Sequence, residues 1–211
     1  MGGKLQRPGP TPLGPRDPGI LEALRAQSAR RSAPAQAALL LLLDGSSSMI
    51  GASWRDLAAA VEALAQASTA ETCLLGLALF SDGADAVCPF QAPPGAIPSR
   101  LPTRPPGGGT GMREGLGLAL RLPWPEGARR RVILLSDGMP TSGDPLPAAR
   151  ELASAGTVLD TVGCGPADEV TLRALAAAGG GRYVFAPSAR DLIRAFLALE
   201  TRARGLLRSA P

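Results

Sequence analysis

Oxygen-bearing side chains follow two apolar stretches of the chain, at the points where those stretches end. One stretch, "LLLLL" at 39–43, leads into an acid and three serines, and another, "VILLS" at 132–136, leads into a second acid. A threonine stands between them in the sequence, directly behind three glycines that allow close approach of the backbone. The candidate ligands are Asp44, Ser46, Ser48, Thr110 and Asp137. Two carboxylates and three hydroxyls form an oxygen-only set, which suits Mg²⁺ or Mn²⁺ and suits Ca²⁺ less well because it offers few carboxylates.

The elements that must position these residues alternate between short apolar runs and helical patterns. Strands are expected at 37–43, 72–80, 131–138, 157–165 and 181–186, and helices at 53–68, 111–122, 144–156, 168–180 and 189–207. A tight turn at Asp82-Gly83 predicts a further strand that pairs with its predecessor as an antiparallel hairpin. The alternation predicts an α/β fold: a doubly wound, mostly parallel six-stranded sheet with one antiparallel edge strand and helices on both faces.

This predicted sheet should bring the candidate ligands together. In a doubly wound sheet, ligands bind beyond the carboxyl ends of the strands, at the point where the strand order reverses. Asp44 and Asp137 each follow a strand, and Thr110 lies in the connection before a helix, so all the candidates should share one edge. Because Mg²⁺ seldom takes a full protein cage, at least one coordination position should stay open to water or an incoming ligand.

The helix expected at 53–68 has a clear inner face and a candidate cap. Ser53 is the expected N-cap, with Asp56 three residues further on. The apolar residues of the inner face are Trp54, Leu57, Val61 and Leu64.

The net charge of +4 is concentrated near the N-terminus. Residues 1–36 carry six basic and two acidic side chains, and the rest of the chain carries sixteen of each. A nucleic-acid-binding domain would need a basic face on the folded part, so we expect no nucleic-acid partner. The triplet "RRR" at 129–131 is interpreted as a solvated entrance to a strand.

Composition also divides the chain into segments. Four are expected: a Pro/Gly-rich, flexible leader at 1–17, a short helical extension and linker at 18–36, the α/β domain at 37–204, and a C-terminal tail at 205–211. No apolar run reaches the roughly 18 residues of a membrane span, and the first residues lack the apolar stretch of a signal peptide. The cysteines, Cys73, Cys88 and Cys164, are odd in number and lie in apolar contexts without metal-type spacing, which indicates reduced core thiols. We therefore expect a cytoplasmic protein without a membrane partner.

Three motifs in this order carry a family resemblance. "DGSSS" at 44–48, "GGGT" at 107–110 and "LLSDGMPTSGD" at 134–144 resemble the von Willebrand factor A (vWA) domain, and the likeness covers about residues 37–200. The resemblance implies a metal-ion-dependent adhesion site (MIDAS) in which Ser46, Ser48 and Thr110 bind the metal directly. It implies that Asp44 and Asp137 act directly or through water. An Asp or Glu side chain of a partner protein would complete the coordination.

The same resemblance also suggests a subgroup of vWA proteins to which the chain is similar. The chain looks like the bacterial intracellular members, in particular the small tellurium-resistance-associated ones. Such members accompany kinases and phosphatases or assist MoxR-type ATPases, and these are the partner systems that the resemblance suggests. An extracellular adhesin is the other binding-protein interpretation.

Simpler structural interpretations and an enzymatic one remain as alternatives. Taken alone, the serine-rich turn could be a helix cap, "SDG" an ordinary turn, and Thr110 the N-cap of its helix. The chain has no histidine, which excludes a Ser-His-Asp triad and a His-ligated zinc centre. The enzymatic alternative is an Mg²⁺-dependent phosphatase with Asp44 as nucleophile, similar to haloacid-dehalogenase-like enzymes. That family has a second Asp where this chain has Ser46, and no lysine follows Lys4.

Overall fold

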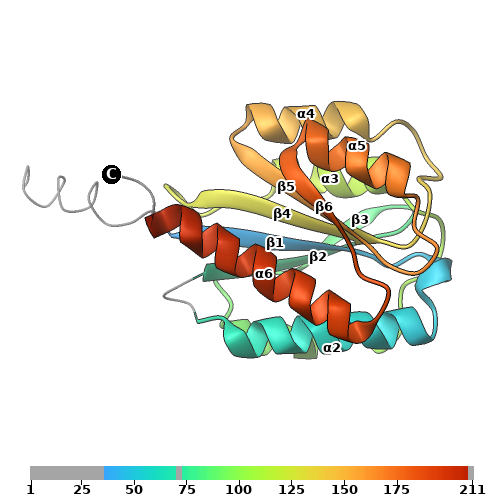
Figure 1. Cartoon of the computed structure of the whole chain (residues 1–211), viewed down its shortest axis with the longest axis horizontal. Coiled ribbons are helices and arrows are strands. Elements are labelled where there is room, and N and C mark those ends of the chain that lie inside the picture. Colours follow the sequence, from blue (N-terminus) through green and yellow to red (C-terminus); the bar gives the residue numbers. More distant parts are fainter. Residues whose placement is uncertain (1–35, 70–72, 209–211) are drawn as a thin grey trace, which may run out of the picture. The chain divides into compact units, whose positions relative to one another are not determined.

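A six-stranded sheet forms the centre of the computed structural model, which describes residues 36–69 and 73–208. The strands are β1 Ala37–Asp44, β2 Cys73–Phe80, β3 Ala84–Cys88, β4 Arg129–Ser136, β5 Thr157–Gly163 and β6 Gly180–Phe185. They lie in the order β3-β2-β1-β4-β5-β6 (Figure 1). All neighbours are parallel except β3, which pairs antiparallel with β2 at one edge. The predicted fold class is confirmed, including the hairpin that turns at Asp82-Gly83.

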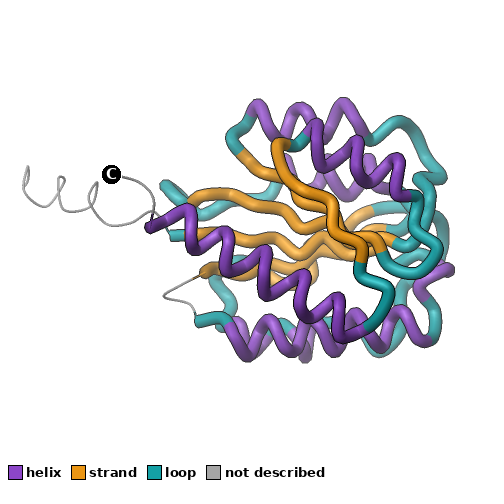
Figure 2. Tube along the Cα trace, in the orientation of Figure 1, coloured by secondary structure: helices purple, strands orange, loops and turns teal. Residues whose placement is uncertain are grey.

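Helices cover both faces of this sheet. They are α2 Ala52–Ala67, α3 Met112–Arg121, α4 Leu146–Ser154, α5 Glu169–Ala178 and α6 Ala189–Arg208, with short 3-10 turns at Ser47–Met49, Pro94–Ala96 and Pro98–Arg100. Helices α2 and α6 pack together on one face, and α3, α4 and α5 lie on the other (Figures 1 and 2). The predicted leader at 1–17 and the extension up to residue 35 lie outside the described residues.

Strand β1 is buried along its whole length because both of its faces are covered. Leu39, Leu41 and Leu43 pack on the side of α2 and α6, whereas Leu40 and Leu42 pack on the opposite side. Each buried leucine contributes about 1.5–3 kcal/mol to stability relative to an exposed one. This unbroken apolar run therefore fixes β1 at the centre of the sheet, with Asp44 at its end.

Helix α2 begins one residue earlier than the sequence predicts. Its N-cap is Gly51, not Ser53, and Ser53 lies inside the first turn. Gly51 has φ of 99°, a left-handed conformation that glycine adopts without strain. This conformation turns the chain sharply from the loop into the helix, so the glycine, not a side-chain cap, sets the start. The expected inner face is confirmed, since Trp54, Leu57, Val61 and Leu64 are all buried.

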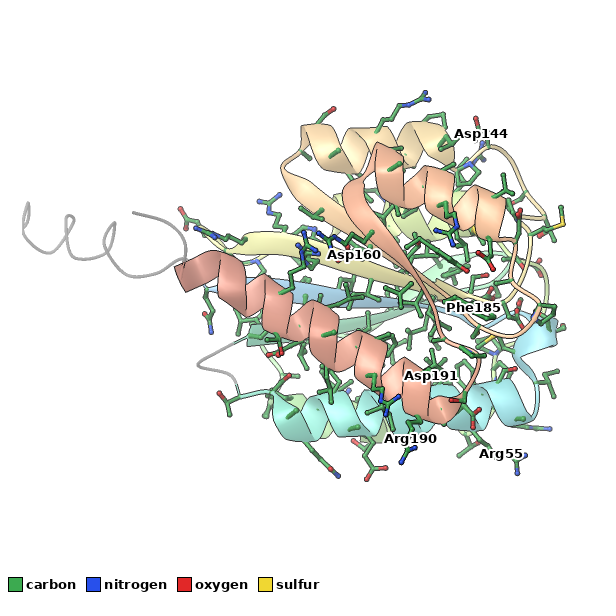
Figure 3. The ribbon with its side chains drawn as sticks, viewed as in Figure 1. Arg55, Asp144, Asp160, Phe185, Arg190 and Asp191 are labelled. Carbon is green, nitrogen blue, oxygen red and sulfur yellow. The ribbon has the colours of Figure 1, made fainter. Side chains whose placement is uncertain are left out.

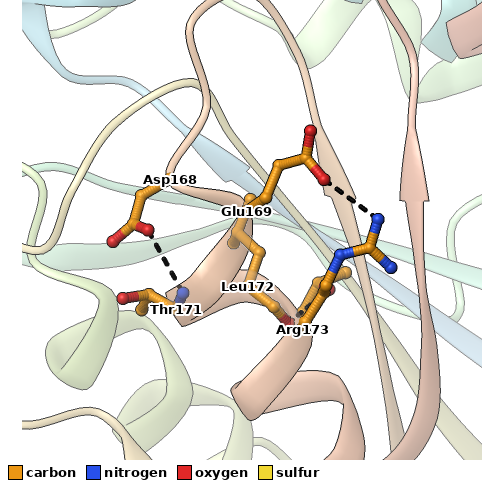
Figure 4. Close-up of polar contacts among 6 residues, drawn as sticks. Asp168, Glu169, Thr171, Leu172 and Arg173 are labelled. Atoms are coloured by element: carbon orange, nitrogen blue, oxygen red, sulfur yellow. Dashed lines mark hydrogen bonds and ion pairs between the residues drawn. The ribbon is translucent and has the colours of Figure 1, made fainter.

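Helix α5 is fixed to the strand before it by polar contacts (Figure 4). The Asp168 carboxylate caps the helix by accepting from the Thr171 N–H at 3.2 Å. The hydroxyl of Thr161, on β5, donates to the carbonyl of Leu172 at 2.8 Å. An exposed ion pair joins Arg173 to Glu169 one turn earlier, at 2.9 Å. The start of α5 is thus capped, and its first turns are tied to β5 by the Thr161–Leu172 hydrogen bond.

The sequence predicts that the arginine triplet at the start of β4 is a solvated entrance to the strand. This prediction is wrong for one of the three residues. Arg129 and Arg130 are partly exposed, but Arg131 is only 5% exposed and forms an ion pair with Asp160. Asp160 is fully buried and belongs to β5; it is labelled in Figure 3. Arg131 and Ile133 are two residues apart in β4, so their side chains lie on the same face of the sheet. Ile133 pairs with Asp160 of β5, whose side chain lies on that face too. The neighbouring strand therefore supplies a carboxylate on the face that Arg131 occupies.

Asp160 also completes the pairing of the last two strands. The register between β5 and β6 shifts after Leu159, and the Arg182 N–H donates to the Asp160 carboxylate at 2.8 Å. Gly181 lies against the Leu159 carbonyl, where a Cβ would stand only 2.0 Å from that oxygen. Glycine is required by this close approach, and the Asp160 side chain replaces a ladder hydrogen bond.

The remaining sequence expectations concern thiols and membranes. Cys73, Cys88 and Cys164 are all buried, and none forms a disulfide within the described residues, as expected of core thiols. Burial, together with the negative charges of nearby carboxylates, raises the pKa of the Cys164 thiol to about 12. Within 36–69 and 73–208, no helix combines the length and apolar character that crossing a membrane requires.

Candidate metal site

The strand order reverses between β1 and β4, which are parallel neighbours. The chain leaves β1 toward α2 on one face of the sheet and leaves β4 toward α4 on the other (Figure 1). The two connections diverge at the carboxyl ends of these strands, which is where ligands bind in doubly wound sheets. Asp44 ends β1 and Asp137 directly follows β4, so both acids stand at this point of divergence.

Hydrogen bonds connect four of the five candidate ligands. The hydroxyls of Ser46 and Ser48 lie 2.9 Å apart, and the Ser48 hydroxyl donates to Asp137 Oδ1 at 2.6 Å. The Ser46 N–H donates to Asp44 Oδ1 at 2.8 Å. Residues from two separate strand ends therefore place their oxygens in one cluster.

Thr110 joins the cluster from a third loop. A Cβ built on Gly138 would lie 3.4 Å from Thr110 Oγ1 and 3.8 Å from Ser48 Oγ, so both hydroxyls border the same point. Thr110 does not cap helix α3, because the N-cap is Gly111 and no side chain caps that end. The Thr110 side chain is buried but has no capping role.

Backbone hydrogen bonds hold the three loops against one another. Gly107 donates to the Gly45 carbonyl at 2.8 Å, and Ser47 donates to the Gly108 carbonyl at 3.1 Å. Thr141 binds both sides of Thr110: its hydroxyl accepts from the Thr110 N–H at 2.7 Å, and its own N–H donates to the Thr110 carbonyl at 3.1 Å. The site is thus assembled by the folded loops themselves.

Ser47 differs from its two neighbours. Its hydroxyl accepts from the Gly108 N–H at 3.0 Å, so it supports the glycine loop and does not enter the oxygen cluster. Of the three consecutive serines, only the first and third face the other candidate ligands.

Sequence reasoning missed two residues that support the site. Ser136, the last residue of β4, donates its hydroxyl to Asp44 Oδ2. Asp82, from the β2–β3 turn, accepts from the Gly109 N–H at 2.7 Å and so holds the glycine loop. A hydroxyl that ends an otherwise apolar strand was the available signal for Ser136. No local signal indicates that Asp82 binds a loop 27 residues away.

The electrostatics of Asp44 are unusual for a buried acid. It is fully buried, and burial raises the pKa of its carboxyl above the ordinary value of 3.8. Hydrogen bonds from Ser136 and Ser46 oppose this rise, and the negative charge of Asp137 adds to it. Asp137 is only 4% exposed. Among the described residues, neither acid forms an ion pair with a basic side chain.

These features fit a divalent ion bound by hard oxygens. Two buried carboxylates without a basic partner favour a nearby positive charge, and three hydroxyls supply neutral ligands of the type that Mg²⁺ and Mn²⁺ accept. The described residues contain no group of three or more histidine, cysteine or acidic side chains that could hold a metal, so a cation at this site would depend on the hydroxyls as well as the two acids. The oxygen cluster is suited to a cation, and Asp44 has no exposed carboxylate oxygen with which to attack a phosphoryl group.

The fold and this cluster define a class: doubly wound α/β domains with an oxygen-lined site at the strand-order reversal. The model of the von Willebrand factor type A domain family matches residues 38–197, and the chain belongs to this family. Such domains generally mediate metal-dependent protein–protein interactions and are typically not enzymes. A search of curated proteins finds no significant match.

Solved structures share the fold at low sequence identity. An aerotolerance-related membrane protein from Bacteroides fragilis, solved with multiple mutations to serine, is 17% identical with a TM-score of 0.69, over 79% of this chain and 99% of that one. BatB from Bacteroides thetaiotaomicron is 19% identical with a TM-score of 0.67, over 82% and 100%. Proximal thread matrix protein 1 from the mussel byssus, solved with a zinc-occupied MIDAS motif, is 20% identical with a TM-score of 0.69. This likeness covers 81% of this chain and 46% of the mussel protein.

Proposed function

We propose that this chain holds one divalent ion of the Mg²⁺/Mn²⁺ class and uses it to bind an acidic side chain of a partner protein. The proposed ligands are Asp44, Ser46, Ser48, Thr110 and Asp137, with the acids acting directly or through water. The observation that carries the proposal is the pair of buried carboxylates, which have no basic partner among the described residues and stand beside converging hydroxyls. The zinc-occupied MIDAS of the mussel protein, a member of the same fold, supports a metal at this position.

The chemistry of the ligands explains why a partner would be needed. Three of the five proposed ligands are neutral hydroxyls. Where the two acids act through water, no anion contacts the ion directly, and the ion keeps part of its positive charge toward an open position. An Asp or Glu of another protein would neutralise that charge and fill a coordination position in a directional, charge-assisted contact. Binding to such a partner would depend on the metal.

The test is calorimetric titration of the full chain with Mn²⁺. We expect Asp44→Ala to weaken Mn²⁺ binding at least tenfold, about 1.4 kcal/mol. Ser47→Ala is the matched control, because Ser47 lies in the same loop but bonds to Gly108, and it should bind Mn²⁺ within about twofold of the unmodified chain. Equal affinities for the unmodified chain and Asp44→Ala would refute the site.

Several finer points remain predictions made from the sequence. They are the bacterial, tellurium-resistance-associated type, a partner from a kinase, phosphatase or MoxR-type ATPase system, the cytoplasmic location, and the domain bounds at 37–204. The assignment of the ion to the Mg²⁺/Mn²⁺ class likewise rests on the hardness of the oxygen ligands.

A further inference from the structure

The loops that surround the candidate metal site carry no charged side chain. These loops are 45–51 after β1, 105–111 before α3, and 138–143 after β4, and together they are called the loop surface. Their residues are glycine, serine, threonine, proline, methionine and isoleucine. A metal ion in the oxygen cluster would thus lie among uncharged loop residues, with the charged Asp82 and Arg113 beside the loops.

Two large apolar side chains are exposed on this loop surface. Ile50 is 62% exposed and Met139 is 68% exposed. Each stands two residues after a candidate ligand, Ser48 or Asp137, whose oxygens are 2.6 Å apart. An exposed apolar side chain is ordinary when it is isolated, but two that flank one polar centre indicate a binding surface.

The other large apolar side chains exposed among the described residues lie outside the loop surface. Val170, 80% exposed, belongs to the first turn of α5, and Phe185, 44% exposed, ends β6 (Figure 3). Neither follows a strand that bears a candidate ligand. They provide a comparison for any test of Ile50 and Met139.

We infer that the partner presents a single Asp or Glu flanked by apolar side chains, which pack on Ile50 and Met139 while the carboxylate binds the metal. This inference rests on the proposed function and adds the chemistry of the partner's recognition segment. An apolar neighbour of the acid gains by leaving water against Ile50 or Met139.

A segment with several acids would fit the loop surface poorly. Only the first carboxylate would meet the metal, and no residue of the loop surface is basic. Arg113, whose guanidinium lies beside Gly143, is already paired with Glu114 at 3.3 Å. Those carboxylates would lose water without gaining a partner. Asp82, which is exposed and holds the Gly109 N–H, adds a negative charge beside the loops and disfavours a second acid further.

The first experiment identifies the preferred sequence around the acid. A displayed library of short peptides, each with one fixed central Glu and random neighbours, is selected on the full chain in Mg²⁺ and counter-selected in EDTA. We expect enrichment of Leu, Ile, Val, Met or Phe beside the Glu and depletion of further acids. Mg²⁺-dependent enrichment of multi-acid peptides would overturn this inference and leave the proposed function standing. The absence of any Mg²⁺-dependent peptide would overturn both.

The second experiment locates the contact. The most enriched peptide is titrated in Mg²⁺ against Ile50→Ser, Met139→Ser and the control Val170→Ser. We expect the Kd to rise about tenfold in each of the first two and to stay unchanged in the control. Mn²⁺ titration without peptide should be unchanged in all three, which separates a lost contact from a damaged metal site. An unchanged peptide Kd in Ile50→Ser and Met139→Ser would refute the inference.

Discussion

Asp44 and Asp160 are both fully buried in the same sheet, but the fold compensates their charges differently. Asp160 pairs with the guanidinium of Arg131 and also accepts from the Arg182 N–H. Within the described residues, Asp44 accepts from neutral groups alone, the Ser46 N–H and the Ser136 hydroxyl, and it lies near a second acid. The negative charge of Asp160 is balanced by a basic side chain of the protein, whereas the charge of Asp44 is not and could be balanced by a bound cation. If the proposed function holds, the comparison separates an acid that stabilises the fold, Asp160, from an acid that binds a cation, Asp44.

The largest expected effect is on stability and concerns the buried ion pair of Arg131 and Asp160. Asp160→Asn should lower the free energy of unfolding by about 3 kcal/mol, because Arg131 would stay buried without a counter-charge. Urea unfolding measures the loss. Arg194→Ala is the control, since it breaks an exposed ion pair with Asp191 and should change stability by no more than about 0.5 kcal/mol. A loss for Asp160→Asn no larger than that of the control would show that the buried pair adds nothing.

Asp44→Asn should have the opposite effect on the metal-free protein. The substitution removes a buried charge that has no basic partner among the described residues, so the metal-free chain should become more stable. The same substitution should weaken Mn²⁺ binding at least tenfold, about 1.4 kcal/mol. Urea unfolding in EDTA and calorimetric titration measure the two quantities. A loss of stability as large as that expected of Asp160→Asn would remove the distinction between the two acids.

The raised pKa of Asp44 predicts how metal binding depends on pH. The metal-free fold favours the protonated carboxyl, so this group's contribution to stability is present below pH 3.8 and is lost as the pH rises through its higher folded pKa. The metal needs the ionised form, and Mn²⁺ affinity should therefore rise with pH over the same interval. Titrations at several values between about pH 4 and pH 7 measure the change. Affinity that is constant or falls over this range would contradict the assignment of Asp44.

The smallest expected effect belongs to a residue that positions Asp44. Ser136→Ala removes the hydroxyl that donates to Asp44 Oδ2, which should weaken Mn²⁺ binding by about 1 kcal/mol, roughly fivefold. Without this donor the pKa of Asp44 should rise further, so the pH profile of Mn²⁺ affinity should move to higher pH. A weaker affinity with an unmoved profile would indicate a merely structural role. Ser136→Thr keeps the hydroxyl and tests for rescue.

The contrast between the two acids also marks what the sequence could predict. The apolar run at 39–43 and its abrupt end predicted the central strand and the position of Asp44, because a strand buried on both faces leaves a strong pattern. Arg131 was interpreted wrongly, since three consecutive arginines resemble a solvated segment. Its partner Asp160 lies 29 residues away on another strand, and only the sheet register brings the two together. An acid inside the apolar run "TVLDTVG" was the signal that a buried cation should be sought.

The start of α2 was predicted wrongly for a different reason. Ser53 is a favoured capping residue, but the left-handed Gly51 begins the helix without any side-chain cap. Residue preferences give the usual solution at a helix end, and a glycine turn can replace it. The support that Ser136 and Asp82 give to the site likewise depends on loop contacts that local patterns do not encode.

The adjacency of β1 and β4 has a consequence for the order in which the protein matures. Ser48 and Asp137 are 89 positions apart, and Asp44 and Ser136 are 92 apart, yet each pair is joined by a hydrogen bond. During synthesis, Asp44 leaves the ribosome well before Asp137 has been added, so an early fragment carries only part of the ligand set. An ion can be captured in full only after β4 has been inserted beside β1. Metal loading would therefore distinguish a finished sheet from a truncated or misassembled one, and a partner that requires the metal would meet only completed molecules.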